Sequence, residues 1–134
     1  MTATTFECAA RDLIFVEAES FADHGGWVLD QQFMDQMGSP YLLAHGMGIP
    51  VKDAVTTVQV STPGSYRVWV RTKDWGAACG APGTPGRFQI GIAGRRLPAV
   101  FGHDGAHWHW QDGGIVAIAA RPIELSLHDL TGFD

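Results

Sequence analysis

The sequence has few cysteines, few basic residues and no long apolar run, and each shortage excludes a class of protein. Cys8 and Cys79 lie far apart without CxxC spacing, so they indicate neither a zinc site nor a redox motif. Both a disulfide and two free thiols fit this spacing. Nine Lys and Arg against 14 Asp and Glu give a net charge of -5, and the basic residues are scattered. We therefore expect no nucleic acid partner.

Signatures of membrane insertion, export and catalysis are also missing. No apolar stretch approaches the roughly 20 residues that span a bilayer, so we expect no membrane partner. The N-terminus, MTATTFECAARD, lacks the charged-then-apolar layout of a secretory signal. No serine lies in a motif that would make it a nucleophile. The glycine-rich residues 76–86 lack the GxGxxG pattern, so we expect no nucleotide or flavin site. The sequence favours a protein that is not itself an enzyme.

The length and composition fit one domain. A chain of 134 residues is near the usual size of a single domain and below the size at which two cores form. Hydrophobic residues at 46% and charged residues at 17% are typical of a soluble globular protein. We expect residues 1–134 to fold as one unit without a cofactor.

Turn residues divide the chain into short segments. The 17 glycines and seven prolines fall in groups that mark turns: Gly25–Gly26, Pro63–Gly64, Pro82–Gly83, Pro85–Gly86, Gly94 and Gly113–Gly114. Between them lie segments of strand length, rich in β-branched and aromatic residues: Leu13–Ala18, Ala54–Val60, Tyr66–Thr72, Phe88–Ile92, Ile115–Ala119 and Ile123–Leu127. Gln31–Met37 has the length of one or two helical turns, and no longer window shows helical periodicity.

Two of these segments alternate between an apolar and a polar face. Tyr66, Val68 and Val70 face one way, and Arg67, Trp69 and Arg71 face the other. Ile123, Leu125 and Leu127 alternate with polar residues in the same manner. Such strands pack one face on a core. The pattern predicts an all-β fold, an antiparallel β-sandwich, with residues 76–86 as a long surface loop.

Several motifs carry a resemblance that covers nearly the whole chain. They are FVEAESF at 15–21, GGWVLD at 25–30, PGSYRVWVR at 63–71, RTKDW at 71–75 and WHWQDGG at 108–114. They resemble carbohydrate-binding modules of the galactose-binding-like type, families 6 and 35, whose chains open with an "AE" strand and carry a "G-x-Y-x-V-x-V-R" strand. Similar domains accompany large bacterial proteins labelled as FAD-dependent oxidoreductases or polysaccharide-degrading enzymes.

The resemblance implies a jelly-roll sandwich, binding of a poly- or oligosaccharide, and an extracellular or periplasmic location. It also implies a structural calcium ion held by Glu17, Glu19 and an aspartate of a last strand beside the first. The sequence stops at Asp134 before such a strand, so either the strand is missing or another element replaces it. Asp134 is then the substitute ligand, and an unpaired edge would favour self-association. The alternative is that both glutamates are solvent-facing carboxylates.

Aromatic and polar side chains beside the predicted loops are the candidate ligand-binding residues. Planar indoles contact the apolar face of sugar rings, which suggests Trp75, Trp108 and Trp110, with Trp75 foremost because glycines beside it keep it accessible. The polar groups in reach, which would bind sugar hydroxyls, are Arg71, Asp74, Asp104, Gln111 and Asp112. The alternative is that the tryptophans pack inside, as we expect for Trp27 and Trp69, and that the acids are merely solvated.

Half of the six histidines lie between residues 103 and 109. On a strand, His107 and His109 would project from one face, as neighbouring metal ligands do. No HExxH motif or cysteine accompanies them, and such histidines commonly bond backbone groups instead.

Three functions follow from these patterns. The first is a non-catalytic carbohydrate-binding module with an aromatic cleft rimmed by loops. The second is a structural or assembly domain that packs on a catalytic partner or on copies of itself. The third is a small metal-dependent enzyme that uses His103, His107 and His109.

Overall fold

The computed structural model describes residues 3–8, 12–78, 80 and 86–132. The strands are β1 (Ala3–Cys8), β2 (Leu13–Glu17), β3 (Val28–Asp30), β4 (Tyr41–Leu43), β5 (Ala54–Gln59), β6 (Gly64–Thr72), β7 (Phe88–Ile92), β8 (Arg95–Arg96), β9 (His109–Ile118) and β10 (Pro122–Asp129). The helices are short: the 3-10 turn η1 (Ala18–Ser20), α1 (Met34–Met37) and α2 (Trp75–Ala78). The predicted all-β class is confirmed.

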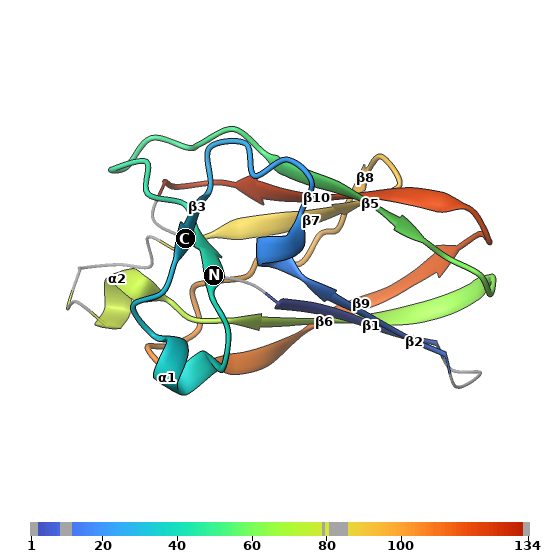
Figure 1. Cartoon of the computed structure of the whole chain (residues 1–134), viewed down its shortest axis with the longest axis horizontal. Coiled ribbons are helices and arrows are strands. Elements are labelled where there is room, and N and C mark those ends of the chain that lie inside the picture. The colour runs from blue at the N-terminus through green and yellow to red at the C-terminus, as the bar shows by residue number, and fades with distance from the viewer. Residues whose placement is uncertain (1–2, 9–11, 79, 81–85, 133–134) are drawn as a thin grey trace.

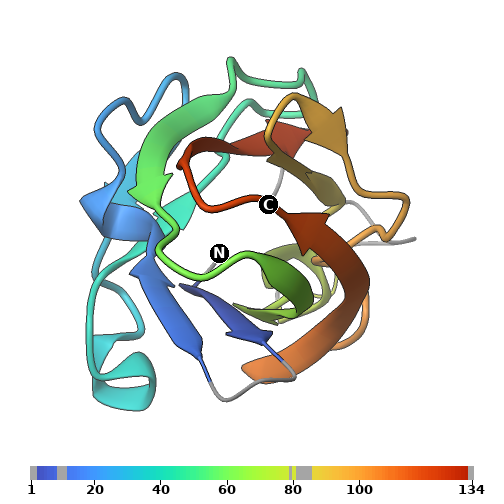
Figure 2. The same ribbon diagram turned by 90° about the vertical axis from the view of Figure 1, so that its right-hand side faces the viewer.

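The strands form two four-stranded sheets and a separate hairpin (Figure 1). The first sheet has the order β2-β1-β6-β9, the second has the order β5-β10-β7-β8, and β3 pairs with β4. Neighbouring strands in all three are antiparallel. Seen end-on in Figure 2, the two larger sheets lie on opposite sides of the interior.

Alternation along the strands fills that interior. On β6 the buried residues are Tyr66, Val68 and Val70, as predicted, and on β10 they are Ile123, Leu125 and Leu127. Both sets belong to one hydrophobic cluster, together with Ile90 and Ile92 of β7. Full burial of a side chain of this size contributes about 1.5–3 kcal/mol. The core therefore joins the two sheets.

The strand β1 was not predicted, and it lies between β2 and β6. In register, Thr5 of β1 is opposite Phe15 on one side and Trp69 on the other. The resemblance reserved the place beside the first strand for a last strand of the chain. In this structure an element near the N-terminus takes that place.

Two other predictions need correction, and one is confirmed. The first predicted strand ends at Glu17, and Glu19 lies on η1, so the two glutamates are not on one strand face. The predicted surface loop at 76–86 begins with α2, in which Gly76 is buried, and residues 79 and 81–85 lie outside the described residues. One helical turn inside Gln31–Met37 is confirmed as α1.

Gly113–Gly114 forms a bulge inside β9 rather than a turn. The register jumps from Arg67 opposite Ile115 to Trp69 opposite Asp112, so β9 carries one extra residue there. Gly114 has φ +89°, and a Cβ on Gly113 would lie 2.8 Å from the Phe101 ring. Both positions therefore require glycine. The bulge keeps Asp112 and Ile115, three residues apart, on the same side of the sheet.

Asp129, at the end of β10, is expected to be the most sensitive carboxylate to substitution. It is 1% exposed and accepts backbone N–H bonds from Val51 (2.7 Å), Thr131 (2.9 Å) and Gly132 (2.7 Å). Asp129→Ala leaves these donors without that partner, so we expect a loss of about 3 kcal/mol in the free energy of unfolding, measured by urea denaturation. Glu124→Ala, an exposed acidic position on the same strand, is the control. Equal losses in both variants would contradict this role.

Candidate functional site

The seven predicted ligand-binding residues fall into two groups that differ in exposure. The side chains on the solvent side of β6 and β9 are Arg71, Trp110 and Asp112. The side chains in the interior or at its border are Asp74, Trp75, Trp108 and Gln111. The two groups therefore differ in exposure, and only the first group lies on the solvent side of the sheet.

The first group belongs to a patch on the solvent side of the sheet that we call the outer face of β6–β9, formed by Arg67, Trp69, Arg71, Trp110 and Asp112. Cross-strand partners in this patch are Arg71 with Trp110 and Trp69 with Asp112. Trp110 is 45% exposed. Arg67 donates to the Asp112 carboxylate at 2.7 Å. Because both partners are largely exposed, this ion pair orients the side chains more than it stabilises the fold.

Arg71 is positioned by hydrogen bonds to backbone oxygens of α1. Its guanidinium donates to the carbonyls of Met37 (3.3 Å) and Gln36 (3.4 Å) in α1. Among the described residues no carboxylate forms an ion pair with it. Since a guanidinium has five N–H donors, Arg71 has donors left for a ligand on the outer face.

Two members of the outer face, Arg67 and Trp69, were not predicted as site residues. The sequence signal was the strict alternation of β6, which already placed both on the same side as Arg71. Trp69 was assigned to packing because tryptophan is usually buried. It is half-buried in the structure.

Trp75 and Trp108 lie in a second hydrophobic cluster. With Phe33 they pack against the buried residues Met37, Tyr41 and Leu43. The rings of Trp108 and Tyr41 are 5.1 Å apart, and the Lys73 Nζ lies 3.3 Å from the centre of the Phe33 ring, a cation–π contact. Both indole N–H groups are buried without a hydrogen-bond partner among the described residues. This placement matches the packing alternative rather than an open aromatic shelf.

The remaining polar candidates have structural contacts. Asp74 is 1% exposed, its carboxylate accepts the Ala77 N–H (3.1 Å), and its own N–H donates to Gly105 (3.0 Å). It thus caps the first turn of α2. The Gln111 side chain donates to the Val100 carbonyl at 2.8 Å. Asp104 lies exposed in the loop before β9, apart from Asp112 on the strand.

The predicted metal ligands that the structure describes lie on different elements. Glu17 is exposed at the end of β2, and one carboxylate oxygen of Glu19 is buried without a partner among the described residues. Asp134, the third predicted calcium ligand, lies outside the described residues. His107 precedes β9, where its carbonyl contacts the His109 Nδ1 at 2.9 Å. No group of three His, Cys, Asp or Glu in the described ranges is arranged to hold a metal ion.

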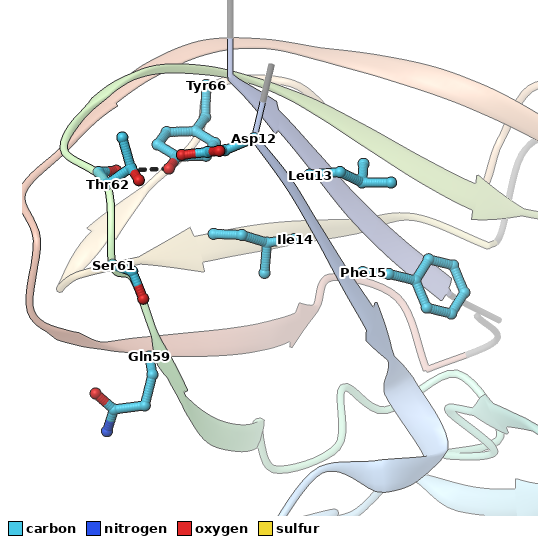
Figure 3. A pocket seen from close by; sticks show the side chains of 8 residues that line it. All are labelled: Asp12, Leu13, Ile14, Phe15, Gln59, Ser61, Thr62 and Tyr66. Carbon is cyan, nitrogen blue, oxygen red and sulfur yellow. Dashed lines mark hydrogen bonds between the residues drawn. The ribbon is translucent and has the colours of Figure 1, made fainter. Parts of the chain in front are cut away.

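Two hollows lie along the edge where the sheets meet. One, of about 460 Å³, is lined by residues 12–15 on one side and by Gln59, Ser61, Thr62 and Tyr66 on the other (Figure 3). The next, of about 520 Å³, is lined by residues 15–17 and Ser20 on one side and by residues 56–58 on the other. They share Phe15, so we treat them as one seam groove between β2 and β5. The two walls are about 40 residues apart in the sequence, so no local pattern predicts the groove.

Comparison with known proteins gives no family assignment. No family model, curated protein or solved structure matches this chain. Within the described residues, no helix has the length and apolar character needed to cross a membrane.

Tyr41 gives the second cluster a pH-dependent contact. Its hydroxyl donates to Asp30 and accepts the Phe33 N–H at 3.2 Å. Burial, and then the bond to Asp30, raise the pKa of Tyr41 well above its usual value. The folded state therefore keeps this proton at a pH where the unfolded chain, with a pKa near 10, releases it.

Tyr41→Phe tests this contact. We expect the wild type to be about 1–2 kcal/mol more stable than the variant at neutral pH, since a hydrogen bond to a carboxylate is lost. The raised pKa makes this advantage complete below about pH 10 and smaller as the pH rises further. Urea denaturation of both proteins between about pH 8 and about pH 11 measures the difference in their free energies of unfolding. Groups that titrate equally in both proteins do not contribute to this difference. A gap that stays constant over this range would disagree with the assignment.

Proposed function

We propose that the chain is a non-catalytic carbohydrate-binding module built as a β-sandwich of jelly-roll type. Support for the sandwich comes from the single hydrophobic cluster shared by the two four-stranded sheets. Support for carbohydrate as ligand comes from the motifs that resemble such modules and from the chemistry of the outer face of β6–β9.

The observation that carries the proposal is the exposed Trp110 opposite Arg71 on the neighbouring strand. The apolar face of a sugar ring stacks on an indole, because both exclude water over a similar area. Next to the indole, the donors of Arg71 and the Asp112 carboxylate are suited to hydroxyl groups, which donate and accept hydrogen bonds. The exposed side chains follow one another along two neighbouring strands, which fits an extended chain of sugars better than a single buried ring.

In this proposal the site binds the sugar chain and catalyses no reaction. Tethered to an enzyme, the module would raise the local concentration of polysaccharide around the catalytic domain. A structural calcium ion at Glu17 and Glu19 and an extracellular or periplasmic location belong to the same proposal. The partly buried carboxylate of Glu19 supports the calcium ion, since calcium prefers oxygen ligands.

An assembly domain is the second candidate, and a specific observation favours it. Leu13, Phe15 and Ile115 are 64%, 57% and 64% exposed. Their registers through β1 and β6 place them on the same side of the first sheet as Trp110. Exposed apolar and aromatic side chains on one face are typical of protein interfaces.

Trp110→Ala separates these two functions. A glycan array, with and without calcium, selects a polysaccharide, and affinity electrophoresis in that polysaccharide measures retention. We expect at least about a tenfold loss of affinity for Trp110→Ala. Removing one aromatic side chain costs about 1–3 kcal/mol where nucleic acid bases stack on it, and we take a similar cost for a sugar ring.

Ile115→Ala is the matched control, since it removes an equally exposed apolar side chain from the same face. We expect it to keep wild-type retention. If Trp110→Ala is retained like the wild type, the outer face is not the sugar site. If light scattering shows that the wild type is an oligomer and that both variants are monomers, the assembly function is supported instead.

A further inference from the structure

We propose that the seam groove between β2 and β5 binds an extended peptide segment that carries a basic residue near each end. This proposal does not depend on carbohydrate binding at the outer face. It rests on three features of the groove: two open strand edges, a row of unpaired backbone groups, and a one-sided charge.

Both walls of the groove are strands at the end of their sheets. β2 has only β1 beside it, and β5 has only β10, among the strands that the structure describes. Residues 12–15 face the 59–62 end of the other wall, and residues 15–17 face residues 56–58. The walls therefore run antiparallel without pairing. Exposed edges of this kind bind extended peptides through main-chain hydrogen bonds.

The backbone of β5 shows which groups a peptide would meet. Val55 exchanges both backbone hydrogen bonds with Asp23, at 3.0 and 2.7 Å, so its N–H and C=O point away from β10. Backbone N–H and C=O groups point to alternate sides along a strand. Those of Thr57 and Gln59 therefore point the same way as those of Val55, toward the groove. The described residues give these groups no partner there. The Asp23 bridge closes one end of this edge, and the rest is open.

The charge of the groove selects the occupant. Asp12 lines one hollow and Glu17 lines the other, and no Lys, Arg or His is among the lining residues. Neither carboxylate forms an ion pair within the described part of the chain. Five residues of extended chain separate them, about 17 Å. A peptide with Lys or Arg five positions apart matches both, and the net charge of -5 favours its approach.

The lining between the two carboxylates is mixed. Ile14 and Val58 supply apolar area, and hydroxyl groups come from Ser61, Thr62 and Thr57. Figure 3 shows the Ile14 side chain between the two walls. This lining fits small apolar or hydroxylated side chains in the middle of the peptide. A second copy of this chain is the poorer occupant, since its own groove would bring the same carboxylates.

Two end-blocked peptides, KVTATK and its charge-reversed twin EVTATE, test the proposal by NMR titration of the full chain in calcium-free buffer, because a calcium ion at Glu17 would neutralise one of the two groove carboxylates. We expect KVTATK to shift the amide signals of Thr57 and Gln59, to slow their hydrogen exchange, and to bind at least about tenfold more tightly than EVTATE. The double variant Asp12→Asn, Glu17→Gln should lose most of this preference. Equal binding of the two peptides, or no binding of KVTATK, would overturn the proposal.

Thr57→Pro tests the backbone contact. Proline removes the N–H that points into the groove and leaves the pairing with β10, whereas Thr57→Ala keeps the N–H and serves as control. We expect about a tenfold loss of KVTATK binding in the first and less than about a twofold change in the second. Unchanged binding by a folded Thr57→Pro would place the peptide elsewhere.

Displacement of the Thr57 and Gln59 signals by a glycan, and not by KVTATK, would assign the groove to sugar instead. If Thr57→Pro does not fold, the backbone contact is tested in the wild type by whether KVTATK slows hydrogen exchange of the Thr57 and Gln59 amides.

Discussion

The antiparallel pairing of β6 with β9 is the interaction on which the rest of the structure depends. It fixes which side chains enter the core and which stay on the solvent side, because side chains alternate along each strand. A slip of one residue would bury Arg67 and expose Val68. The Gly113–Gly114 bulge is part of this constraint, since it keeps Ile115 on the same side as Asp112. The outer face therefore exists only in this register.

Alternation is also why much of the fold was predictable. A strand with one buried face shows its pattern locally, so β6 and β10 could be predicted with the correct inward residues. The short strands could not. All three residues of β4 are buried, so no alternation marks them, and β1 is defined by its pairing with β2 and β6 rather than by a pattern of its own. Such pairings are tertiary, and propensity does not show them.

The candidate site divides along the same line. Arg71, Trp110 and Asp112 were predicted and lie together on the outer face, because they are strand residues whose neighbours are set by register. Trp75 was predicted as open because its sequence neighbours are small. What covers it are Phe33, Met37 and Tyr41, about 40 residues earlier in the chain. The small neighbours therefore indicated an accessible Trp75, and a distant segment of the chain partly covers it.

β2 connects the outer side of the first sheet with the seam groove. Phe15 lines both hollows of the groove and also belongs to the cross-strand row that leads to Trp69. The two surfaces nevertheless differ in charge. The outer face of β6–β9 has two arginines for one aspartate, whereas the groove has two carboxylates and no basic residue. The two surfaces therefore favour different ligands. The sugar chain proposed for the outer face and the basic peptide proposed for the groove would not compete for the same charges.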